Sequence, residues 1–512
     1  MSFSDTLTEL GLSHILDRPK YFPIELLNSD KIYNAIDDFR QNNLRVLIYG
    51  DYDTDGCMCI KEWILFMNLI GHHNYEVYEY TNRMHTVDPG AVRKAIEEQF
   101  DYIIISDSGS SELGDSGLIT KLLKFGVKVV VIDHHYTPYN YEDYPVGCSI
   151  VNNIIENRLC PDKEPISVSA GALVFLVLDY YLHRYTSVLN NDQMSAYALI
   201  SLYADSIDMS STLNRSIYYK AMQLKDNPNL PIDIQIFLES YNTFSRRFIE
   251  FNYTPKINCC FRNEVFGILN DYLATNSRNV TMMTSRMSLI KQLHIETAEN
   301  IELAVDNIEY ELLDNFVIGS LNTVSHLIDI EETRLYNFTG LIANKLAERH
   351  GKCGVVFCAR GDRIQGSFRD LQSRNYLPIF KQFCKADGHP PAFGFSLSTW
   401  EYSSFMRFLI KVDKQFFLAQ TSNRPIVVPH EGFLPSPELL GDVAKYNEFS
   451  GSRIPMALVS KTLNGDITEV ITSYGYKYRW GNLNISSKRR IEPGEVMLIK
   501  PFYDNTLRLT VI

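Results

Sequence analysis

The chain has 512 residues, 45% of them hydrophobic, so it is long enough for about two to four domains with separate cores. With 49 basic and 61 acidic residues its net charge is −12, so the molecule as a whole repels polyanions and could bind a nucleic acid only through metal ions or local basic patches. No run approaches the roughly 20 apolar residues that span a bilayer, residues 1–18 lack the order of a signal peptide, and nine cysteines without a CxxC pair indicate reduced thiols. We therefore expect a cytoplasmic protein without a membrane partner.

The first strand is predicted at residues 44–50, LRVLIYG, a β-branched apolar run that ends at a glycine. Directly after it, Asp51, Asp53 and Asp55 occupy alternate positions, and carboxylates so close repel one another unless a cation or hydrogen bonds compensate. Together with the next glycine and Glu62 they match the EF-hand pattern for calcium. An EF-hand loop follows a helix, and the preceding strand therefore argues against calcium.

The following segments alternate between predicted helices and strands. Residues 101–109 and 128–135 are two more buried strands, which end in polar groups, and helix-compatible segments separate them. This alternation predicts an α/β fold with a parallel sheet and right-handed crossovers, in which the carboxyl ends of the strands share one ligand-binding edge. An aspartate after a strand is, taken alone, more typical of a turn or a helix cap. Here, however, such groups follow three predicted parallel strands in a row. We therefore predict that five groups converge at this edge: Asp53, Asp55, Asp107, His134 and His135.

Carboxylate oxygens with an imidazole form the ligand set that manganese or magnesium prefers over zinc. Further helices are predicted at residues 167–182 and 195–209, the second of which contains Asp205 near its end. Residues 295–316 repeat apolar side chains on one helical face, at Ile301, Val305, Ile308 and Leu312, with acidic residues opposite. We expect this segment to be a long helix that links two domains.

A second α/β unit is predicted from about residue 318. Glycines lie beside Ser367, Arg369 and His389, which indicates close approach of the backbone to an anion, although hairpin turns give the same pattern. Past residue 425 the chain consists of short β segments, which predict a small all-β module. Within it, residues 474–480 alternate aromatic and smaller or basic side chains. The aromatic face, either a platform that stacks unpaired bases or the core of the module, contains Tyr474, Tyr476, Tyr478 and Trp480.

These motifs resemble, in matching order, those of the DHH phosphoesterases and in particular of the RecJ-type single-strand exonucleases. The similarity covers most of the chain. GDYDTDG is similar to the GDYDADG of the family, VVVIDHH contains the name-giving motif, and GSFRD resembles GSARS. The other matching segments are IIISDSG, CSIVNN, SAGALVF, YADSIDMSSTLNR, PKINCCFR and ADGHPPAFGFSL, and a terminal β module fits the OB-fold of the family. Three features depart from the family pattern: Tyr49 stands where many members have a histidine, Phe261 replaces a glycine, and GHPPAFG contains inserted prolines.

The resemblance implies two divalent cations, manganese first and magnesium as the alternative. Asp53 and Asp205 would hold one ion, Asp55 and His134 the other, and Asp107 would bridge the two. It further implies that His135 lies against the phosphate or the attacking water, that Asp133 orients the histidines, and that Asp51 braces the loop. The residues implied to bind phosphate or substrate are Arg262, Ser367, Arg369 and His389.

The implied architecture is a DHH catalytic domain at residues 1–270, a helical linker at 271–316, a DHH-associated domain at 317–420 and an OB-like module at 421–512. The implied activity is 5′ to 3′ hydrolysis of single-stranded DNA to mononucleotides in DNA repair and recombination, by a monomer that a helicase or single-strand-binding protein assists. Two alternatives stay open: a phosphodiesterase for short RNA oligonucleotides or cyclic dinucleotides, and a non-catalytic replication factor of the same fold.

Overall fold

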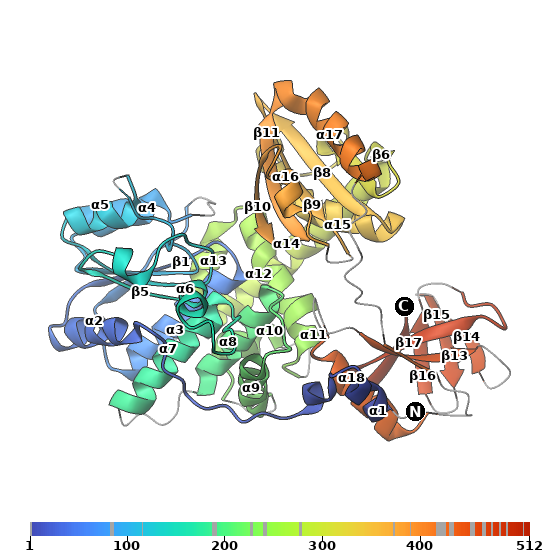
Figure 1. Cartoon of the computed structure of the whole chain (residues 1–512), viewed down its shortest axis with the longest axis horizontal. Coiled ribbons are helices and arrows are strands. Elements are labelled where there is room, and N and C mark those ends of the chain that lie inside the picture. Colours follow the sequence, from blue (N-terminus) through green and yellow to red (C-terminus); the bar gives the residue numbers. More distant parts are fainter. Residues whose placement is uncertain are drawn as a thin grey trace. The chain divides into compact units, whose positions relative to one another are not determined.

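The computed structural model describes most of the chain and is divided into two compact units (Figure 1). The first unit contains Met1–Phe261, Phe266–Met287 and Pro425–Ile512, and the second contains Arg262–Val265 and Ser288–Arg424. No helix among the described residues is both long and apolar enough to cross a membrane. The description leaves out residues 1–2, 82–85, 115, 187–191, 226–228, 239–242, 276–278, 372–373, 390, 416–425, 430–434, 451–455, 463–466, 473–474, 481–482, 488–489 and 505.

The first unit is built around a parallel sheet in the order β2-β1-β3-β4-β5. The central strands β1 and β3 are buried along their whole length, because each of them consists mainly of apolar residues. Figure 1 shows α4 and α5 on one side of this sheet and α2, α3 and α7 on the other. The strands are β1 (Val46–Gly50), β2 (Tyr75–Val77), β3 (Tyr102–Ser106), β4 (Lys128–Asp133) and β5 (Cys148–Asn152).

Helices follow the strands as the sequence predicts, and the α/β class with a parallel sheet is confirmed. The helices of the first unit that precede Phe261 are α1 (Phe3–Glu9), α2 (Ser29–Gln41), α3 (Thr54–Leu69), α4 (Pro89–Glu97), α5 (Leu118–Lys124), α6 (Asn153–Leu159), α7 (Ala170–Tyr185), α8 (Asp192–Ala204), α9 (Thr212–Ala221), α10 (Ile232–Leu238) and α11 (Arg246–Phe248). They are followed by α12 (Thr254–Arg262), α13 (Phe266–Leu273) and α14 (Val280–Asn307).

Two glycines let β1 turn directly into α3. A Cβ on Gly50 would lie 2.5 Å from the carbonyl oxygen of Gly56, and a Cβ on Gly56 would lie 2.3 Å from that of Asp51. Strand and helix can therefore meet only without these side chains. Glu62 lies inside the continuous helix α3 and is fully buried, so it cannot complete a calcium loop, and the EF-hand interpretation is wrong.

The long predicted helix ends earlier than its periodicity indicates. Helix α14 stops at Asn307, and Ile301 and Val305 are buried on one of its faces as expected. Leu312, placed on the same helical face by the sequence, instead lies in strand β6 (Tyr310–Leu312) and is 49% exposed. The apolar spacing continues past the end of the helix because Ile308, the next residue, is buried in the same cluster as Ile301 and Val305.

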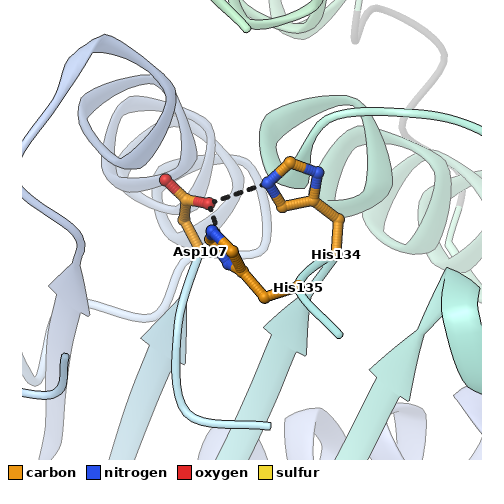
Figure 2. A group of neighbouring side chains, drawn as sticks. All are labelled: Asp107, His134 and His135. Atoms are coloured by element: carbon orange, nitrogen blue, oxygen red, sulfur yellow. Dashed lines mark ion pairs between the residues drawn. The ribbon is translucent and has the colours of Figure 1, made fainter. Parts of the chain in front are cut away.

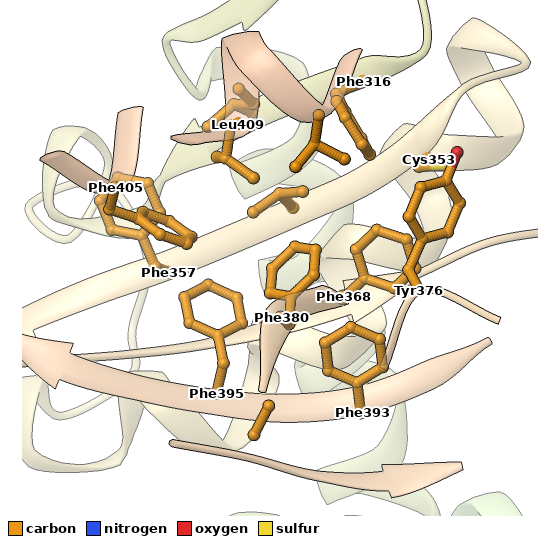
Figure 3. Close-up of a cluster of buried hydrophobic side chains, with 14 of the residues drawn as sticks. Phe316, Cys353, Phe357, Phe368, Tyr376, Phe380, Phe393, Phe395, Phe405 and Leu409 are labelled. Carbon is orange, nitrogen blue, oxygen red and sulfur yellow. The ribbon is translucent and has the colours of Figure 1, made fainter. Parts of the chain in front are cut away.

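The second unit contains a mixed sheet in the order β10-β11-β9-β8-β7-β6. One face packs α17 (Tyr402–Gln415) onto a cluster of phenylalanines, in which Phe368 stacks on Phe393 with ring centroids 4.7 Å apart (Figure 3). Part of the other face packs on α15 (Thr339–His350). The remaining elements are β7 (Phe316–Ser320), β8 (Cys353–Arg360), β9 (Arg363–Arg369), α16 (Leu377–Phe380), β10 (Lys385–His389) and β11 (Ala392–Ser398).

The last part of the chain forms a mixed sheet in the order β12-β13-β17-β18-β16-β15-β14, together with helix α18 (Pro437–Asn447). The aromatic strand of the sequence is β15 (Gly475–Trp480). The other strands are β12 (Ile426–Pro429), β13 (Ala457–Thr462), β14 (Ile467–Thr472), β16 (Leu483–Ser487), β17 (Val496–Asp504) and β18 (Thr506–Val511). The expected module of short strands is present, and the helix is an addition that the sequence analysis missed.

The aromatic face of β15 is core where its side chains are described. Tyr478 is 1% exposed and its hydroxyl accepts the N–H of Ile491 at 2.6 Å, while Trp480 is 0% exposed. A fully buried ring offers no face to a nucleobase, so the stacking interpretation is wrong for these two rings. Tyr476 is half-buried, and Tyr474 lies outside the described residues.

Candidate metal centre and phosphate-binding residues

His134 is the centre of a group of carboxylates at the carboxyl edge of the parallel sheet. Its Nε2 lies 3.3 Å from Asp107 Oδ1, 3.3 Å from Asp205 Oδ2 and 4.0 Å from Asp55 Oδ2. Asp107 follows β3, His134 follows β4 and Asp205 follows α8, so the strand ends bring together residues far apart in sequence. Asp55, Asp107 and His134, three of the five groups expected to converge, lie together at this edge, and Asp205 joins them.

Asp107 is held in a backbone conformation that few residues adopt. Its φ is 61°, and its N–H donates to the carbonyl of Ile132 at 2.9 Å. Figure 2 shows one carboxylate oxygen of Asp107 facing ring nitrogens of His134 and His135, and the Nδ1 of His135 lies 3.8 Å from Asp107 Oδ1. That Oδ1 is buried without a hydrogen-bond donor among the described residues. Burial raises the pKa of Asp107 well above its usual range, and the charges of Asp55 and Asp53 raise it further.

Asp55 is fixed by helix ends rather than by the strand that precedes it. Its two oxygens accept the N–H groups of Ala170 and Gly171 at 2.9 Å each, at the start of α7. Ser201 of α8 donates a further short hydrogen bond. A Cβ on Gly171 would lie 2.6 Å from the hydroxyl of Ser201, so only glycine fits here. Gly171 and Ser201 were missed by sequence reasoning, although the small residues at the start of this helix were its visible signal.

Asp53 and Asp51 flank the cluster in different ways. Asp53 is the N-cap of α3, and its Oδ1 accepts the N–H groups of Asp55 and Gly56 at 2.8 and 3.2 Å. Asp51 is buried, and its Oδ1 has no donor among the described residues. Burial raises the pKa of Asp51 well above its usual range, followed by the charge of Asp53. Bracing of the loop therefore does not explain all of Asp51, because its Oδ1 forms no hydrogen bond with the described residues of the loop.

Asp133 orients one of the two histidines. Its Oδ1 lies 2.8 Å from His135 Nδ1 and its Oδ2 accepts the N–H of Ser110 at 3.0 Å. Burial alone would lower the pKa of His135, but the bond to Asp133 and the charges around it outweigh burial and raise that pKa to about 10. Burial would raise the pKa of Asp133, and the bond to His135 reverses this to a value well below the usual range. The side chain of His135 nevertheless remains largely exposed beside the carboxylates.

The donors fit a divalent metal. Ligand atoms of Asp107, His134 and His135 lie within 4.8 Å of one another, as do those of Asp55, His134 and Asp205. Carboxylate oxygens with imidazole suit manganese or magnesium, and a cation would compensate the oxygen of Asp107 that lacks a donor. Tyr49, at the position of the histidine in many family members, donates its hydroxyl to the carbonyl of Thr86 at 3.2 Å.

The residues expected to bind phosphate lie in the second unit. Ser367 and Arg369 are on one face of β9, and the Ser367 hydroxyl lies 2.9 Å from that of Thr339, the first residue of α15. A Cβ on Gly340 would lie 2.5 Å from Arg369 Nη2, so the guanidinium lies against the start of this helix. The carbonyl of Arg262 accepts a bond from Asn337 at 2.9 Å, two residues before Thr339. Residues 337–340 thus touch all three and were missed by sequence reasoning.

The strand register adds His389 to the same region. His389 pairs with Ala392, which pairs on its other side with Arg369, so the three form one row across the sheet. The side chain of His389 lies outside the described part of the structure. Gly394, next along β11, is exposed, and a Cβ there would touch nothing closer than 3.8 Å. Because packing does not require this glycine, it is typical of a place where a ligand approaches a strand closely.

Residues 45–203 match the family model described as the DHH family, N-terminal domain, so this segment is similar to the DHH domains. The chain is similar to the single-stranded-DNA-specific exonuclease RecJ of Escherichia coli K12, with 21% identity over 402 residues that cover 73% of this chain and 67% of the relative. The RecJ of Dickeya dadantii 3937 is 22% identical over 440 residues, which cover 80% and 73%. The resemblance expected from the motifs is thereby confirmed.

Solved structures agree with this assignment at the level of the fold. RecJ from Thermus thermophilus in complex with Mn²⁺ matches with a TM-score of 0.73 over 99% of this chain and 74% of that one, at 15% identity. An exonuclease RecJ bound to manganese matches with a TM-score of 0.55 over 77% and 97%, at 16% identity. At such identities the likeness establishes the fold, and the chemistry depends on the residues of this chain.

Proposed function

We propose that this protein is a metal-dependent exonuclease that hydrolyses single-stranded DNA from the 5′ end and releases mononucleotides. The observation that carries the proposal is the convergence of Asp55, Asp107, His134 and Asp205 around the segment that is similar to the DHH domains. The similarity to RecJ supports the substrate, since those relatives are named as specific for single-stranded DNA. It also supports manganese as the first cofactor and magnesium as the second, since RecJ of Thermus thermophilus has been solved with each.

In this proposal Asp53 and Asp205 would hold one cation, Asp55 and His134 would hold the other, and Asp107 would be a ligand of both. The N–H donors on Asp53 and Asp55 leave further lone pairs on each carboxylate, so these residues remain able to bind metal. When bound, the two cations would lower the pKa of a bound water and neutralise charge that develops on the phosphate. No side chain of the protein then has to act as the nucleophile.

Side chains of both units would bind and orient the phosphodiester. His135 is held through Nδ1 by Asp133, and the raised pKa favours the protonated ring, which can donate a hydrogen bond to a phosphate oxygen. Ser367, Arg369 and Arg262 supply a hydroxyl and two guanidinium groups that bind phosphate and fix its orientation for in-line attack. Asp133 acts only through His135, as a positioning residue.

Strands of DNA and RNA labelled at the 5′ or the 3′ end, incubated with the protein in Mn²⁺, test this proposal directly. We expect 5′-labelled single-stranded DNA to release labelled mononucleotide at once and 3′-labelled DNA to shorten gradually, with no cleavage in chelator. Preference for short RNA oligonucleotides or cyclic dinucleotides would favour the phosphodiesterase alternative. Full-length product from every substrate in Mn²⁺ and in Mg²⁺ would contradict hydrolysis altogether.

A further inference from the structure

Trp400 differs from both other tryptophans of the chain in its exposure. Trp63 and Trp480 are 0% exposed, whereas Trp400 is 80% exposed, in the short helix η7 (Thr399–Glu401) of the second unit. Leaving so large an apolar ring in water forgoes about 2 kcal/mol or more of burial. A tryptophan in such a place is typical of a surface that contacts a partner.

The backbone under Trp400 is rigid. Ser398 and Glu401 form a capping box around the turn, in which the N–H of Ser398 donates to Glu401 Oε2 at 2.8 Å. The N–H of Thr399 donates to the carbonyl of Asp362 at 2.8 Å and fixes the turn to the β8–β9 hairpin. The exposed indole is thus presented from a fixed position, which lowers the entropy lost on binding.

Helix α17 continues from this turn and divides its side chains by charge. Its inner face is apolar: Phe405 and Leu409 are buried and point into the phenylalanine cluster (Figure 3). The acidic residue of the helix, Asp413, is also buried and accepts the N–H groups of Asp314 and Asn315 at 3.1 and 2.6 Å. No carboxylate of α17 therefore faces solvent.

The outer face of α17 is basic. Arg407, Lys411 and Lys414 are exposed and follow one another at spacings of four and three residues, which places them on one side of a helix. None of the three lies within 4 Å of a carboxylate in the described part of the chain, and Arg407 bonds only to the hydroxyl of Ser404. A basic stripe without counter-ions is unusual in a chain of net charge −12.

We propose that Trp400 and the basic stripe of Arg407, Lys411 and Lys414 form a binding surface for single-stranded nucleic acid. The stripe and the tryptophan together span about 20 Å along the helix axis, enough for several nucleotides. The cations attract the phosphates, and the indole stacks on a base, which it can do only if that base is unpaired. This surface rests on the proposed function, which makes single-stranded nucleic acid the substrate of the protein.

Tryptophan fluorescence in chelator tests the surface without any hydrolysis. Because the two other indoles are buried, quenching by an oligo(dT) of about twenty nucleotides reports on Trp400. We expect saturable quenching of the wild-type protein by the oligo(dT), and little by a duplex of equal length. Absence of quenching at low salt would overturn the proposal and leave the surface to another kind of partner.

Binding of a fluorescently labelled oligo(dT), followed by anisotropy, measures each contribution. We expect Trp400→Ala to weaken binding about tenfold and Trp400→Phe much less, since phenylalanine still stacks. The triple variant Arg407→Gln/Lys411→Gln/Lys414→Gln should flatten the dependence of log affinity on log salt by about 2. Lys121→Gln/Lys124→Gln, on the exposed face of α5, is the matched control and should leave that slope unchanged. Equal slopes for the triple variant and this control would contradict the proposal.

Hydrolysis of a very short strand in Mn²⁺ separates this inference from the proposed function. A strand too short to bind α17 should be cleaved at equal rates by the wild-type protein and the triple variant. At low concentrations of a long strand, the variant should cleave more slowly than the wild-type protein. If the wild-type protein cleaves nothing but its tryptophan is still quenched, the nuclease proposal fails and the binding surface stands. Cleavage of long strands at equal rates by both proteins would overturn the surface.

Discussion

At the scale of single residues, Asp107 combines three unusual properties. Its φ of 61° costs a residue with a side chain about 1–2 kcal/mol, its carboxylate is buried, and one of its oxygens lacks a donor among the described residues. A fold keeps such a residue when the surrounding structure compensates the strain, and such outliers gather at functional sites. Asp107 faces two histidines, and this position suits a residue that binds a metal ion.

Asp107→Asn tests this role, because asparagine also tolerates a positive φ and has the same shape. We expect nuclease activity to fall by about a hundredfold or more, since even residues behind a metal ligand cost up to about that much. The metal-free variant should melt at the same temperature or higher, because one repelling charge is removed. Asp162→Asn, on an exposed position, is the matched control. Retained activity in Asp107→Asn would remove the metal centre from the account.

Glu62 is a second buried acid, but one outside the cluster. It is 0% exposed, and neither of its carboxylate oxygens has a partner in the described structure. Burial raises its pKa well above the usual range, and the charge of Asp55 raises it further. A group with a raised pKa stabilises the fold most at acidic pH and loses this contribution as pH rises towards the folded pKa.

Glu62→Met should therefore stabilise the protein by about 1 kcal/mol or more, and by more at pH 8 than at pH 5. Denaturant unfolding at the two pH values measures the change in the free energy of unfolding. Glu97→Met on the exposed face of α4 serves as control and should change little. A loss of stability in Glu62→Met at both pH values would show that this carboxyl has a partner we have not identified.

At the scale of elements, strand β15 shows what alternation in a sequence leaves open. Alternating aromatic residues predict that the rings share one face, and this holds for Tyr478 and Trp480, both of which are buried. Which face another layer covers depends on tertiary packing, and here the core covers the aromatic one. The sequence therefore could not decide between a stacking platform and a core.

Trp480→Ala should destabilise the C-terminal module by about 3–5 kcal/mol, through the cavity left by the indole. Trp480→Phe should cost less and leave the affinity for an oligo(dT) unchanged. Thermal unfolding and anisotropy measure the two effects. Weaker binding by a well-folded Trp480→Phe would restore the stacking interpretation.

The end of helix α18 contacts residues of the parallel-sheet part of the first unit. Arg246 donates to the carbonyls of Asn447 and Glu448 at 2.8 Å each, and the hydroxyl of Tyr203 donates to that of Glu448 at 3.1 Å. Burial raises the pKa of the Glu448 carboxyl to about 7, although Arg246 lowers it. Because the folded pKa is the higher one, this group favours folding below about pH 4.5 and loses that contribution as pH rises through 7.

The wild-type protein should accordingly lose more stability between pH 5 and 8 than Glu448→Gln does. The difference is at most about 3 kcal/mol and smaller for a partly exposed side chain. Melting temperatures of both proteins across this pH range provide the comparison. Parallel curves would mean that Glu448 ionises freely in the folded protein.

At the scale of the whole molecule, the sequence located the strand ends and the groups that follow them, because β-branched runs and their terminal aspartates are local signals. It did not show that Asp55 accepts the first N–H groups of α7, which lies more than a hundred residues away in sequence. Nor did it show that Asp51 is buried with an Oδ1 that lacks a donor among the described residues. The cluster is thus predictable in membership and unpredictable in its hydrogen bonds. The residues proposed for metal binding lie in the first unit, and most of those proposed for phosphate binding lie in the second.

An anomalous-scattering map from crystals soaked in manganese, recorded at the manganese absorption edge, tests the central claim most directly. We predict two peaks beside Asp107, one within bonding distance of Asp205 and the other within bonding distance of His134. A map without a peak at this cluster, from crystals that take up manganese elsewhere, would contradict the account.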